Sequence, residues 1–551
     1  MDRTHASVQA ALEPTTREAE TMGEAIAAAR SVRPDVPYLT FAETGETYTV
    51  AEVDDWATRV AGGLADLGVS RGDRVALYLR NSPAFVAAVY ACAKLGAVQV
   101  PVNPDYRERE VRHAFDTADP VACLVGPDAD HLENLAAVED EFDALTDCVL
   151  VEDAVSEPVD GPEPLVDCGL SVHRFTDLDG PVPDVEVGPE DPFTIIYTSG
   201  TTGLPKPALL PHRSYLLSGK SFLPALPDDD VNYNPFPLFH GNNQYYSMVA
   251  PLLAGTEWLL GRKFTASKFR ALVETYGVTS FNVLGGTPKL LLSAYDSFPE
   301  TTLEVAIGPI GTETWDRFAD RFSIRVVQIY SQTESPTLLM NHPEPGKVRT
   351  GAIGKPMFPD RGHEATVVDR EGNAVPAGEE GELTRTDPGA MLEYFRMPER
   401  TEETLREGRI FSGDVVRADE DGYLYYVDRL KFMIRRSGEN IAPREVEEVI
   451  DELAGVAESA VIPVPDDVRG EEVKAMVRRT GVDGVTERDV VRRVATTLAA
   501  HKVPRYVEFV DSFPKTPSER IQRVQLAEQE TDRDEFGWDR DREYPDWADD
   551  V

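Results

Sequence analysis

Tyr197-Thr198-Ser199-Gly200-Thr201-Thr202-Gly203-Leu204-Pro205-Lys206 directly follows a short apolar run, Phe193 to Ile196. The run is β-branched and predicts a buried strand. Glycines let backbone N–H groups approach a ligand, hydroxyls add donors, and the final lysine brings a mobile charge suited to phosphate. The loop lacks the Gly-x-x-x-x-Gly-Lys-Ser/Thr spacing of the common nucleotide-binding loop. We therefore predict a polyphosphate-binding loop at the end of a strand, with an ordinary surface turn as the alternative.

The length and charge of the chain limit its domain organisation and the partners that it can bind. Its 551 residues are too many for one core, so several domains or lobes are expected. The 97 acidic residues against 55 basic ones give a formal net charge of −42, which repels nucleic acid and anionic membranes. Because the acidic residues are spread along the whole chain, we interpret them as an adaptation to a cytoplasm with very high salt, that is, a halophilic protein.

The cysteines and the apolar runs predict a reduced, soluble, cytoplasmic protein. Cys92, Cys123, Cys148 and Cys168 are scattered, with no Cys-x-x-Cys pair, so neither a zinc site nor a disulfide framework is indicated. The first 34 residues carry acidic residues where a signal peptide needs an apolar centre. The longest apolar stretch, 84–102, is interrupted by Lys94, so no membrane span is expected.

Alternating strand and helix patterns predict parallel βαβ units in a large N-terminal domain. A helix from Val53 stops at Gly68, a strand covers 74–79, and Asn81-Ser82-Pro83 caps a second helix that ends at Gly96. Beyond the loop, helical patterns at 250–260 and 268–276 alternate with strand patterns. The carboxyl ends of these strands fall at His240, Gly308 and Tyr330 to Glu334, where the sites of parallel sheets lie.

After residue 360 the pattern changes to short alternating segments with Asp-Gly and Glu-Gly turns, which predicts a small antiparallel sheet. Ser412-Gly413-Asp414 lies at a turn within it, and a helix from Pro443 opens a compact α+β domain. The expected division is an N-terminal domain at 1–428, a C-terminal domain at 429–530, and an acidic tail at 531–551. The tail is expected to be loosely ordered unless Trp538 and Trp547 dock.

Five separated motifs in this order resemble the adenylate-forming superfamily of acyl-CoA synthetases, aryl-CoA ligases, luciferases and peptide-synthetase adenylation domains. They are the 197–206 loop, Pro237 to His240, Tyr330 to Glu334, Ser412 to Asp414, and Asp428 to Glu445. Residues 428–441 look most like the carnitine/crotonobetaine-CoA ligase branch. The resemblance covers about 53–522 and implies an α/β fold whose small C-terminal lid domain is mobile.

The resemblance implies a two-step reaction that uses ATP, Mg²⁺ and CoA. A carboxylate attacks the α-phosphate of ATP to give an acyl-adenylate and pyrophosphate, and a thiol then takes the acyl group. Fixed donors and a metal would neutralise the charge that develops. By resemblance, Glu334 ligates Mg²⁺, Tyr330 stacks on adenine and Asp414 accepts both ribose hydroxyls. The phosphates and nearby groups would be bound by Thr198, Ser199, Gly200, Thr201, Thr202, Gly203, Lys206, Thr333 and Arg429.

Other positions follow from the same resemblance. The acyl pocket would include His240, Asn243 and Gly285, and the amides and tyrosines of the 240–246 stretch (Asn242, Asn243, Gln244 and Tyr245 among them) suggest a polar or modest-sized acid. Lys431 would be the hinge of the C-terminal domain, and Gly438 would leave room for the pantetheine arm of CoA. Taken singly, each has a structural alternative: a core aromatic for Tyr330, a turn former for Asp414, a solvated charge for Lys431.

The sequence departs from the family pattern at three places. Pro207 follows Lys206 where glycine is usual, which disfavours helical geometry at Lys206. Ser331 replaces a usual glycine. Arg520 stands where the family has a lysine that bridges the carboxylate and the α-phosphate, and a guanidinium keeps the charge in a larger planar fork. We hypothesise that Arg520 does this work in a modified geometry, the alternative being that the position no longer contributes.

Three functions therefore remain. The favoured one is an AMP-forming acyl-CoA ligase acting on a small-molecule carboxylic acid, without nucleic-acid or membrane partners. The second is an adenylating enzyme that loads a separate carrier protein. The third is a nucleotide- or acyl-CoA-binding protein that has lost catalysis, against which the retained Lys206, Glu334 and Asp414 argue. The sequence leaves a homodimer open.

Overall fold

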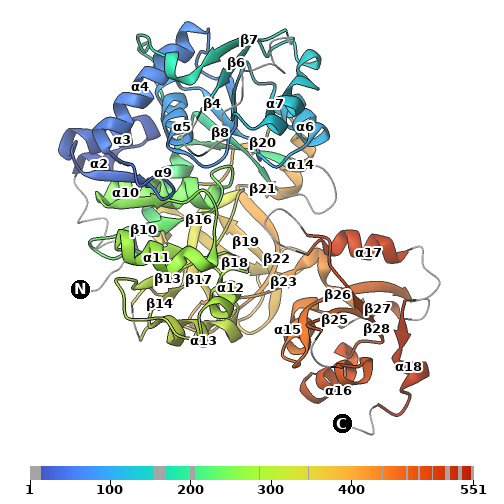
Figure 1. The fold of residues 1–551 in the computed structure, drawn as a ribbon. Helices are drawn as coiled ribbons and strands as arrows, with labels where there is room; N and C mark the ends of the chain where they lie inside the picture. The colour runs from blue at the N-terminus through green and yellow to red at the C-terminus, as the bar shows by residue number, and fades with distance from the viewer. Residues whose placement is uncertain are drawn as a thin grey trace. The chain divides into compact units, whose positions relative to one another are not determined.

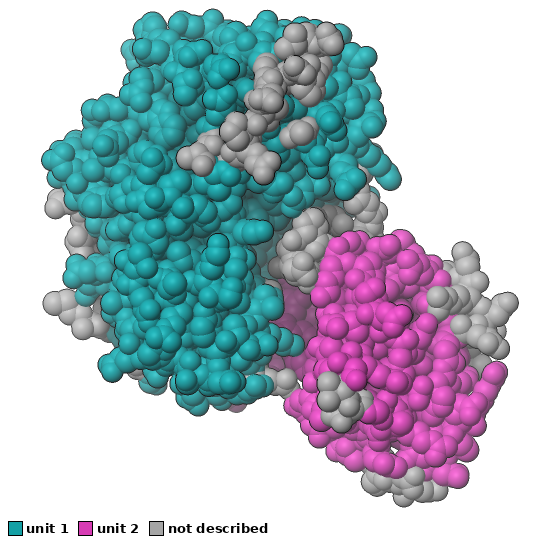
Figure 2. Space-filling model, in the orientation of Figure 1, with its two compact units in different colours: residues 1–365, 385–411 teal, residues 366–384, 412–551 magenta. Residues whose placement is uncertain are grey.

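The computed structural model describes residues 14–152, 155, 169–198, 205–284, 286–344, 346–436, 439–466, 469–481, 484–498, 500–515, 521–531 and 536–547. Most of the predicted phosphate loop (199–203), Gly285, Gly438 and Arg520 thus lie outside the described residues. The chain divides into two compact units, residues 1–365 with 385–411 and residues 366–384 with 412–551 (Figure 2). None of the described helices is long and apolar enough to cross a bilayer.

The first sheet of unit 1 confirms the predicted βαβ units. Its strand order is β20-β9-β8-β4-β3-β5-β6-β7, and it is parallel from β8 to β7. The strands are β3 (Arg74–Tyr78), β4 (Val98–Pro101), β5 (Ala122–Val125), β6 (Asp147–Leu150), β7 (Ser171–Arg174), β8 (Pro192–Thr198), β9 (Lys206–Pro211) and β20 (Glu393–Tyr394).

Helices cover both faces of this sheet because successive residues of its strands point to opposite faces and are apolar on both, as the burial of β3, β4 and β5 shows. Val75 and Leu77 pack in the core with α4 (Val50–Asp66) and α5 (Pro83–Leu95). Ala76 and Tyr78 pack on the opposite face with α6 (Glu108–Ala118) and α7 (Ala129–Ala136) (Figure 1). The predicted cap of α5 is present, since the Ser82 side chain accepts from the Phe85 N–H, and Gly96 ends the helix at φ 66°.

The second sheet has the order β14-β13-β12-β10-β11-β1-β2 and is parallel from β14 to β1. Its outer face packs against α11 (Ala266–Tyr276), α12 (Thr287–Ala294) and α13 (Thr312–Phe322). Its strands are β1 (Pro37–Phe41), β2 (Thr47–Thr49), β10 (Val231–Asn234), β11 (Glu257–Leu260), β12 (Ser280–Asn282), β13 (Val305–Ile307) and β14 (Arg325–Val327). Helices α2 (Pro14–Glu18), α3 (Met22–Val32), α9 (His212–Phe222) and α10 (Val249–Ala254) complete this part.

The helix expected over 250–260 is wrong in its second half. Helix α10 ends before Gly255, whose φ of 76° is left-handed, and residues 257–260 form β11 between β10 and β1. A short run of buried apolar residues has no periodicity that separates a helix from a central strand. After β14, the chain turns into an antiparallel series, β15 (Ile329–Gln332), β16 (Ser335–Met340) and β17 (Ala352–Pro356).

Four strands lie side by side in the order β23-β22-β19-β18, and most of their residues belong to unit 2. Strand β21 (Leu405–Arg406) pairs with β22. The four strands are β18 (Glu364–Val368), β19 (Glu380–Thr386), β22 (Arg409–Ala418) and β23 (Leu424–Arg429), and α14 (Pro398–Thr404) precedes β21. The predicted α+β fold follows: β24 (Ile434–Arg436), β25 (Glu439–Ile441), α15 (Pro443–Asp451), β26 (Val456–Asp466), β27 (Gly470–Arg479), α16 (Glu487–Thr497), β28 (Tyr506–Val510), α17 (Arg523–Thr531), β29 (Trp538–Asp539) and α18 (Arg540–Glu543).

Candidate active site

Lys206 and Glu334, which the sequence predicted to bind phosphate and metal, meet through a third residue. The Lys206 ammonium donates to the Tyr394 hydroxyl at 3.0 Å and lies 4.2 Å from the centre of its ring. The same hydroxyl donates to Glu334 Oε1. A phenol has one proton to give, so Tyr394 accepts from the cation and donates to the carboxylate. The three residues form a cluster in which one carboxylate oxygen is held in place.

Local geometry explains why Lys206 occupies this position. Pro207 disfavours a helical Lys206, and Lys206 instead begins β9, directly opposite Thr198 at the end of β8. Thr198 therefore lies beside Lys206. Strand β20 pairs with β9 and brings Tyr394 opposite Ala208.

A buried ionic group supports the Tyr330 to Glu334 segment from behind. Arg385 is fully buried, donates to the backbone oxygen of Ser335 at 2.8 Å, and lies 5.7 Å from the ring centre of Tyr330. Asp387 accepts from the Ser335 hydroxyl at 2.7 Å. Burial, and then the Arg385 charge, lower the pKa of the neighbouring His363 to about 4, so this histidine adds no second positive charge. Thr333 is half-buried in the turn between β15 and β16.

A π-helix over Asn242–Ser247 follows His240 and contacts the same segment. The Met248 N–H donates to the Asn243 oxygen at 3.0 Å, five residues back, and such widened turns are frequent at functional sites. The hydroxyls of Tyr246 and Ser331 are 2.8 Å apart. A Cβ on Gly241 would lie 2.1 Å from the Tyr245 ring, so the entry to this helix requires glycine.

The two described residues of the predicted acyl pocket differ in their surroundings. His240 is half-buried beside Phe239, with ring centres 4.4 Å apart. Asn243 is fully buried and donates to the Phe236 oxygen at 2.5 Å, so its side chain holds the turn after β10. Their place in an acyl pocket stays a prediction.

Asp414 and Arg429 form a separate pair within unit 2. They face each other across β22 and β23, and Arg429 Nε lies 2.7 Å from Asp414 Oδ1. Asp414 is 1% exposed, and its N–H donates to the Ser412 hydroxyl at 3.1 Å. Gly413 adopts φ 67° while its N–H donates to Glu382. The carboxylate is therefore rigidly held, as recognition of a diol would require. Lys431 lies just after this pair, in a short 3-10 turn over Leu430–Phe432.

The metal prediction can be compared with the residues around Glu334. Among the described residues, no group of three or more histidine, cysteine, aspartate or glutamate side chains could hold a metal ion. Mg²⁺ bound to nucleotides takes one or two carboxylates and completes its shell with phosphate oxygens and waters. A single carboxylate with one oxygen fixed by Tyr394 fits that mode.

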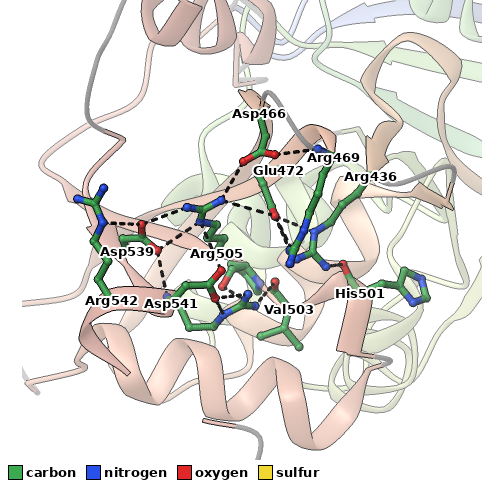
Figure 3. Close-up of polar contacts among 12 residues, drawn as sticks. Arg436, Asp466, Arg469, Glu472, His501, Val503, Arg505, Asp539, Asp541 and Arg542 are labelled. Carbon is green, nitrogen blue, oxygen red and sulfur yellow. Dashed lines mark hydrogen bonds and ion pairs between the residues drawn. The ribbon is translucent and has the colours of Figure 1, made fainter. Parts of the chain in front are cut away.

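A second ionic cluster attaches the C-terminal segment to the rest of unit 2 (Figure 3). Arg505 pairs with Asp466 at 2.9 Å and with Asp539 at 3.3 Å. Arg540 is buried, donates to the Val503 oxygen at 2.9 Å, and lies 4.6 Å from the Trp547 ring centre. A pocket of about 490 Å³ is lined by Arg436, Arg469, Ala500, His501, Arg540, Asp541 and Trp547. Because Arg436, Arg469 and Arg540 already pair with carboxylates, we assign this cluster a structural role.

Residues 26–395 match the family model of the AMP-binding enzyme, and 445–520 match that of the AMP-binding enzyme C-terminal domain. This chain is an AMP-binding enzyme. The superfamily and the α/β fold predicted from the sequence are thus confirmed. The match to the C-terminal model ends at 520, so β29, α18 and Trp547 lie beyond it.

The enzyme is similar to several characterised ligases. It is 33% identical over 496 residues to feruloyl-CoA synthase of Amycolatopsis sp, covering 88% of this chain and 94% of that protein. It is 31% identical over 498 residues to the fatty acid–[acyl-carrier-protein] ligase ScoC of Streptomyces coeruleorubidus, covering 88% and 92%. The ATP-bound structure of MatB from Rhodopseudomonas palustris superposes with a TM-score of 0.80 at 27% identity, covering 92% and 98%.

Proposed function

We propose that this enzyme is an ATP-dependent acyl-CoA ligase, which activates a carboxylic acid as an acyl-adenylate, releases pyrophosphate, and transfers the acyl group to CoA. The observation that carries the proposal is the Lys206–Tyr394–Glu334 cluster beside the end of β8. A carboxylate and a polyphosphate repel each other, so their reaction needs a fixed cation and a metal-binding carboxylate close together.

Within this proposal, the residues of unit 1 bind and orient ATP. Thr198 and Lys206, with the 199–203 loop, would hold the β and γ phosphates, and Thr333 would contact the nucleotide. Tyr330 would stack on adenine with its ring supported by Arg385. Glu334 would hold Mg²⁺, which when bound draws charge from the phosphate oxygens.

The remaining assignments concern the ribose, the acid and the thiol. Asp414, held by Arg429, would accept both ribose hydroxyls. His240 and Gly285 would line the acyl pocket, Lys431 would be the hinge, and Gly438 would leave the channel for CoA. The division into 1–428, a mobile 429–530 and a tail at 531–551 belongs to this proposal, as does the carnitine-type branch.

The test is pyrophosphate release with ATP and Mg²⁺ in high potassium chloride, over short, medium, aromatic and betaine-type acids, with and without CoA. Release that turns over only with CoA would support the ligase and identify the acid class. Absence of release with every acid, despite ATP binding, would contradict it and favour a binding protein that has lost catalysis.

A carrier-protein ligase is the second candidate, because ScoC, 31% identical, is named for transfer to an acyl-carrier protein. The same assay separates the two. If pyrophosphate release stops after one turnover with CoA but continues with a phosphopantetheinylated carrier protein, the acceptor is the carrier.

Arg520 provides a prediction on the first half-reaction. We expect Arg520→Ala to slow adenylation by about 10²-fold, the usual effect of removing one charge-stabilising donor, and to spare thioester formation from supplied acyl-adenylate. Arg520→Lys should recover most of the adenylation rate because it restores the charge. Equal loss in both half-reactions, or no loss in either, would contradict the assignment.

Salt dependence is the next prediction and rests on the net charge of −42. We propose that the enzyme works in a salt-rich cytoplasm and expect its Tm to fall on dialysis from molar salt to about 0.1 M. The screening length grows from about 3 Å to about 10 Å over that range, so self-repulsion of the acidic surface increases. Calorimetry at both concentrations measures the change, and an unchanged Tm would rule the adaptation out.

Light scattering in the same buffers tests for a homodimer.

A further inference from the structure

A row of buried polar side chains runs along β10 and β12, on the face of the sheet that α11 to α13 do not cover. Asn232 and Asn234 alternate on β10, Ser280 and Asn282 alternate on β12, and Asn232 lies opposite Ser280 in the parallel register. All four are fully buried. Buried amides must find partners, so the hydrogen bonds along this row follow from donor and acceptor chemistry.

The hydrogen bonds along the row have a fixed donor-to-acceptor direction, which Asp230 sets at the amino end of the strands. The hydroxyls of Thr279 and Ser280 donate to Asp230 at 2.6 and 3.1 Å, because a carboxylate can only accept. The Ser280 oxygen is thereby left as an acceptor, and Asn232 Nδ2 donates to it at 2.7 Å. Asn232 Nδ2 also donates to Asn282 Oδ1 at 3.2 Å. With its oxygen so occupied, Asn282 turns its Nδ2 toward Asn242 Oδ1, 3.1 Å away.

A second, independent chain of bonds reaches the same oxygen. The backbone N–H of Phe236 donates to Asn234 Oδ1 at 3.0 Å, which fixes the orientation of that amide. Asn234 Nδ2 consequently donates to Asn242 Oδ1, also at 3.1 Å. Two fixed N–H donors therefore converge on Asn242 Oδ1, and a flipped Asn242 would oppose both with its own N–H groups. The Asn242 amide nitrogen must point away from the row.

Asn242 is the first residue of the π-helix, two positions after His240, at the carboxyl end of β10. It is half-buried, and its Nδ2 makes no hydrogen bond within the part of the chain that the structure describes. The same π-helix reaches the Tyr330 to Glu334 segment through Tyr246 and Ser331. Ligands of parallel sheets bind at this edge.

We propose that Asn242 is a specificity-determining residue, a fixed amide N–H donor that recognises an acceptor oxygen on the acyl part of the acid. This inference rests on the proposed ligase function and deepens it. The favoured substrates are acids that carry a carbonyl, ether or hydroxyl oxygen beyond the reacting carboxylate. A quaternary ammonium offers no acceptor, so a betaine-type acid without such an oxygen is disfavoured.

The experiment compares pairs of acids of equal shape in the pyrophosphate assay, an ether against its methylene analogue, for example methoxy- against ethyl-substituted aryl acids. An ether oxygen accepts but cannot donate, so the pair isolates an N–H donor. We expect wild type to favour the ether by about 10-fold or more in kcat/KM, because a donor left unpaired on binding is costly. Asn242→Leu should bring the ratio close to one.

Asn242→Asp is the sharper variant because it is nearly isosteric. One carboxylate oxygen still accepts from Asn234 and Asn282, and the other replaces the donor with an acceptor. We expect the ether preference to be lost and acids with a primary ammonium to gain relative to ethers. Asn373→Asp, which adds the same charge on an exposed turn, should keep the wild-type ratio.

Each outcome decides the matter. Turnover with equal use of both acids by wild type, or an unchanged ratio in Asn242→Leu, overturns the role of Asn242 and leaves the ligase function standing. Absence of turnover with every acid overturns both. Thermal unfolding of each variant is measured alongside, and the Asn242→Asp result carries the test if Asn242→Leu does not fold.

Discussion

Glu334→Gln is expected to lower the rate of acyl-adenylate formation by about 10³-fold or more, while the protein remains folded. A bound metal supplies several kcal/mol of charge stabilisation in the transition state, and each 1.36 kcal/mol is tenfold in rate. Glutamine keeps the size of the side chain and an oxygen that can accept from Tyr394. The lost quantity is therefore the negative charge that would hold Mg²⁺.

Pyrophosphate release with the acid that the wild type uses best measures this effect, over a range of Mg²⁺ concentrations. The apparent affinity for Mg²⁺ should fall together with the rate, whereas thioester formation from supplied acyl-adenylate should continue. Glu399→Gln, on an exposed turn of α14, is the matched control and should change neither. A Glu334→Gln enzyme with wild-type Mg²⁺ dependence would show that the metal is held elsewhere.

Lys474→Met is expected to destabilise unit 2 by about 3–5 kcal/mol, the usual cost of removing one member of a buried ion pair. Lys474 lies on β27, is fully buried, and bonds to Glu508 and Glu530, each at 2.5 Å. Glu508 is 29% exposed at its side chain and can be solvated, but Glu530 on α17 is only 2% exposed. The variant would remove the Lys474 ammonium from the buried carboxylate of Glu530.

Urea unfolding followed by tryptophan fluorescence, to which Trp538 and Trp547 of unit 2 contribute, measures this loss. The double variant Lys474→Met/Glu530→Met should recover most of the stability, because a buried ion pair replaced by apolar side chains is often neutral. Arg444→Met breaks a surface pair with Glu448, whose partners are 39% and 45% exposed, and should cost less than about 1 kcal/mol. A Lys474→Met loss as small as that would contradict the expected cost of breaking this buried pair.

Local signals in the sequence were sufficient for much of the fold. Helix α5 begins after Ser82, with Pro83 in its first turn, and ends at Gly96. These ends could be predicted because capping depends on residues within one turn of each end. The βαβ alternation likewise follows from periodicity. The apolar run at 257–260 was misread as helix because only its pairing with β10 and β1 makes it a strand.

The sequence likewise predicted only part of the candidate site. Motifs pointed to Lys206 and Glu334, but Tyr394, which joins them, lies 188 residues after Lys206 and reaches it only because β20 pairs with β9. Arg385 and Asp387 were missed for the same reason, since a charged pair reads as surface until its burial is known. The direction of the Asn242 amide depends on five other side chains, so the spacing of residues in the sequence cannot predict it.

Because the Asn242 amide is oriented by other side chains, substitutions away from the substrate could change the substrate preference over time. One of the two chains of hydrogen bonds that orient the outward donor of Asn242 begins at Asp230, which precedes the four-residue strand β10 and so lies about 13 Å from that strand's carboxyl end. If an amide replaced the Asp230 carboxylate, its side chain could donate as well as accept hydrogen bonds. One of the two chains of hydrogen bonds that orient Asn242 would then lose its fixed direction. Inherited differences in the acids accepted by related enzymes can therefore originate in residues that no substrate touches.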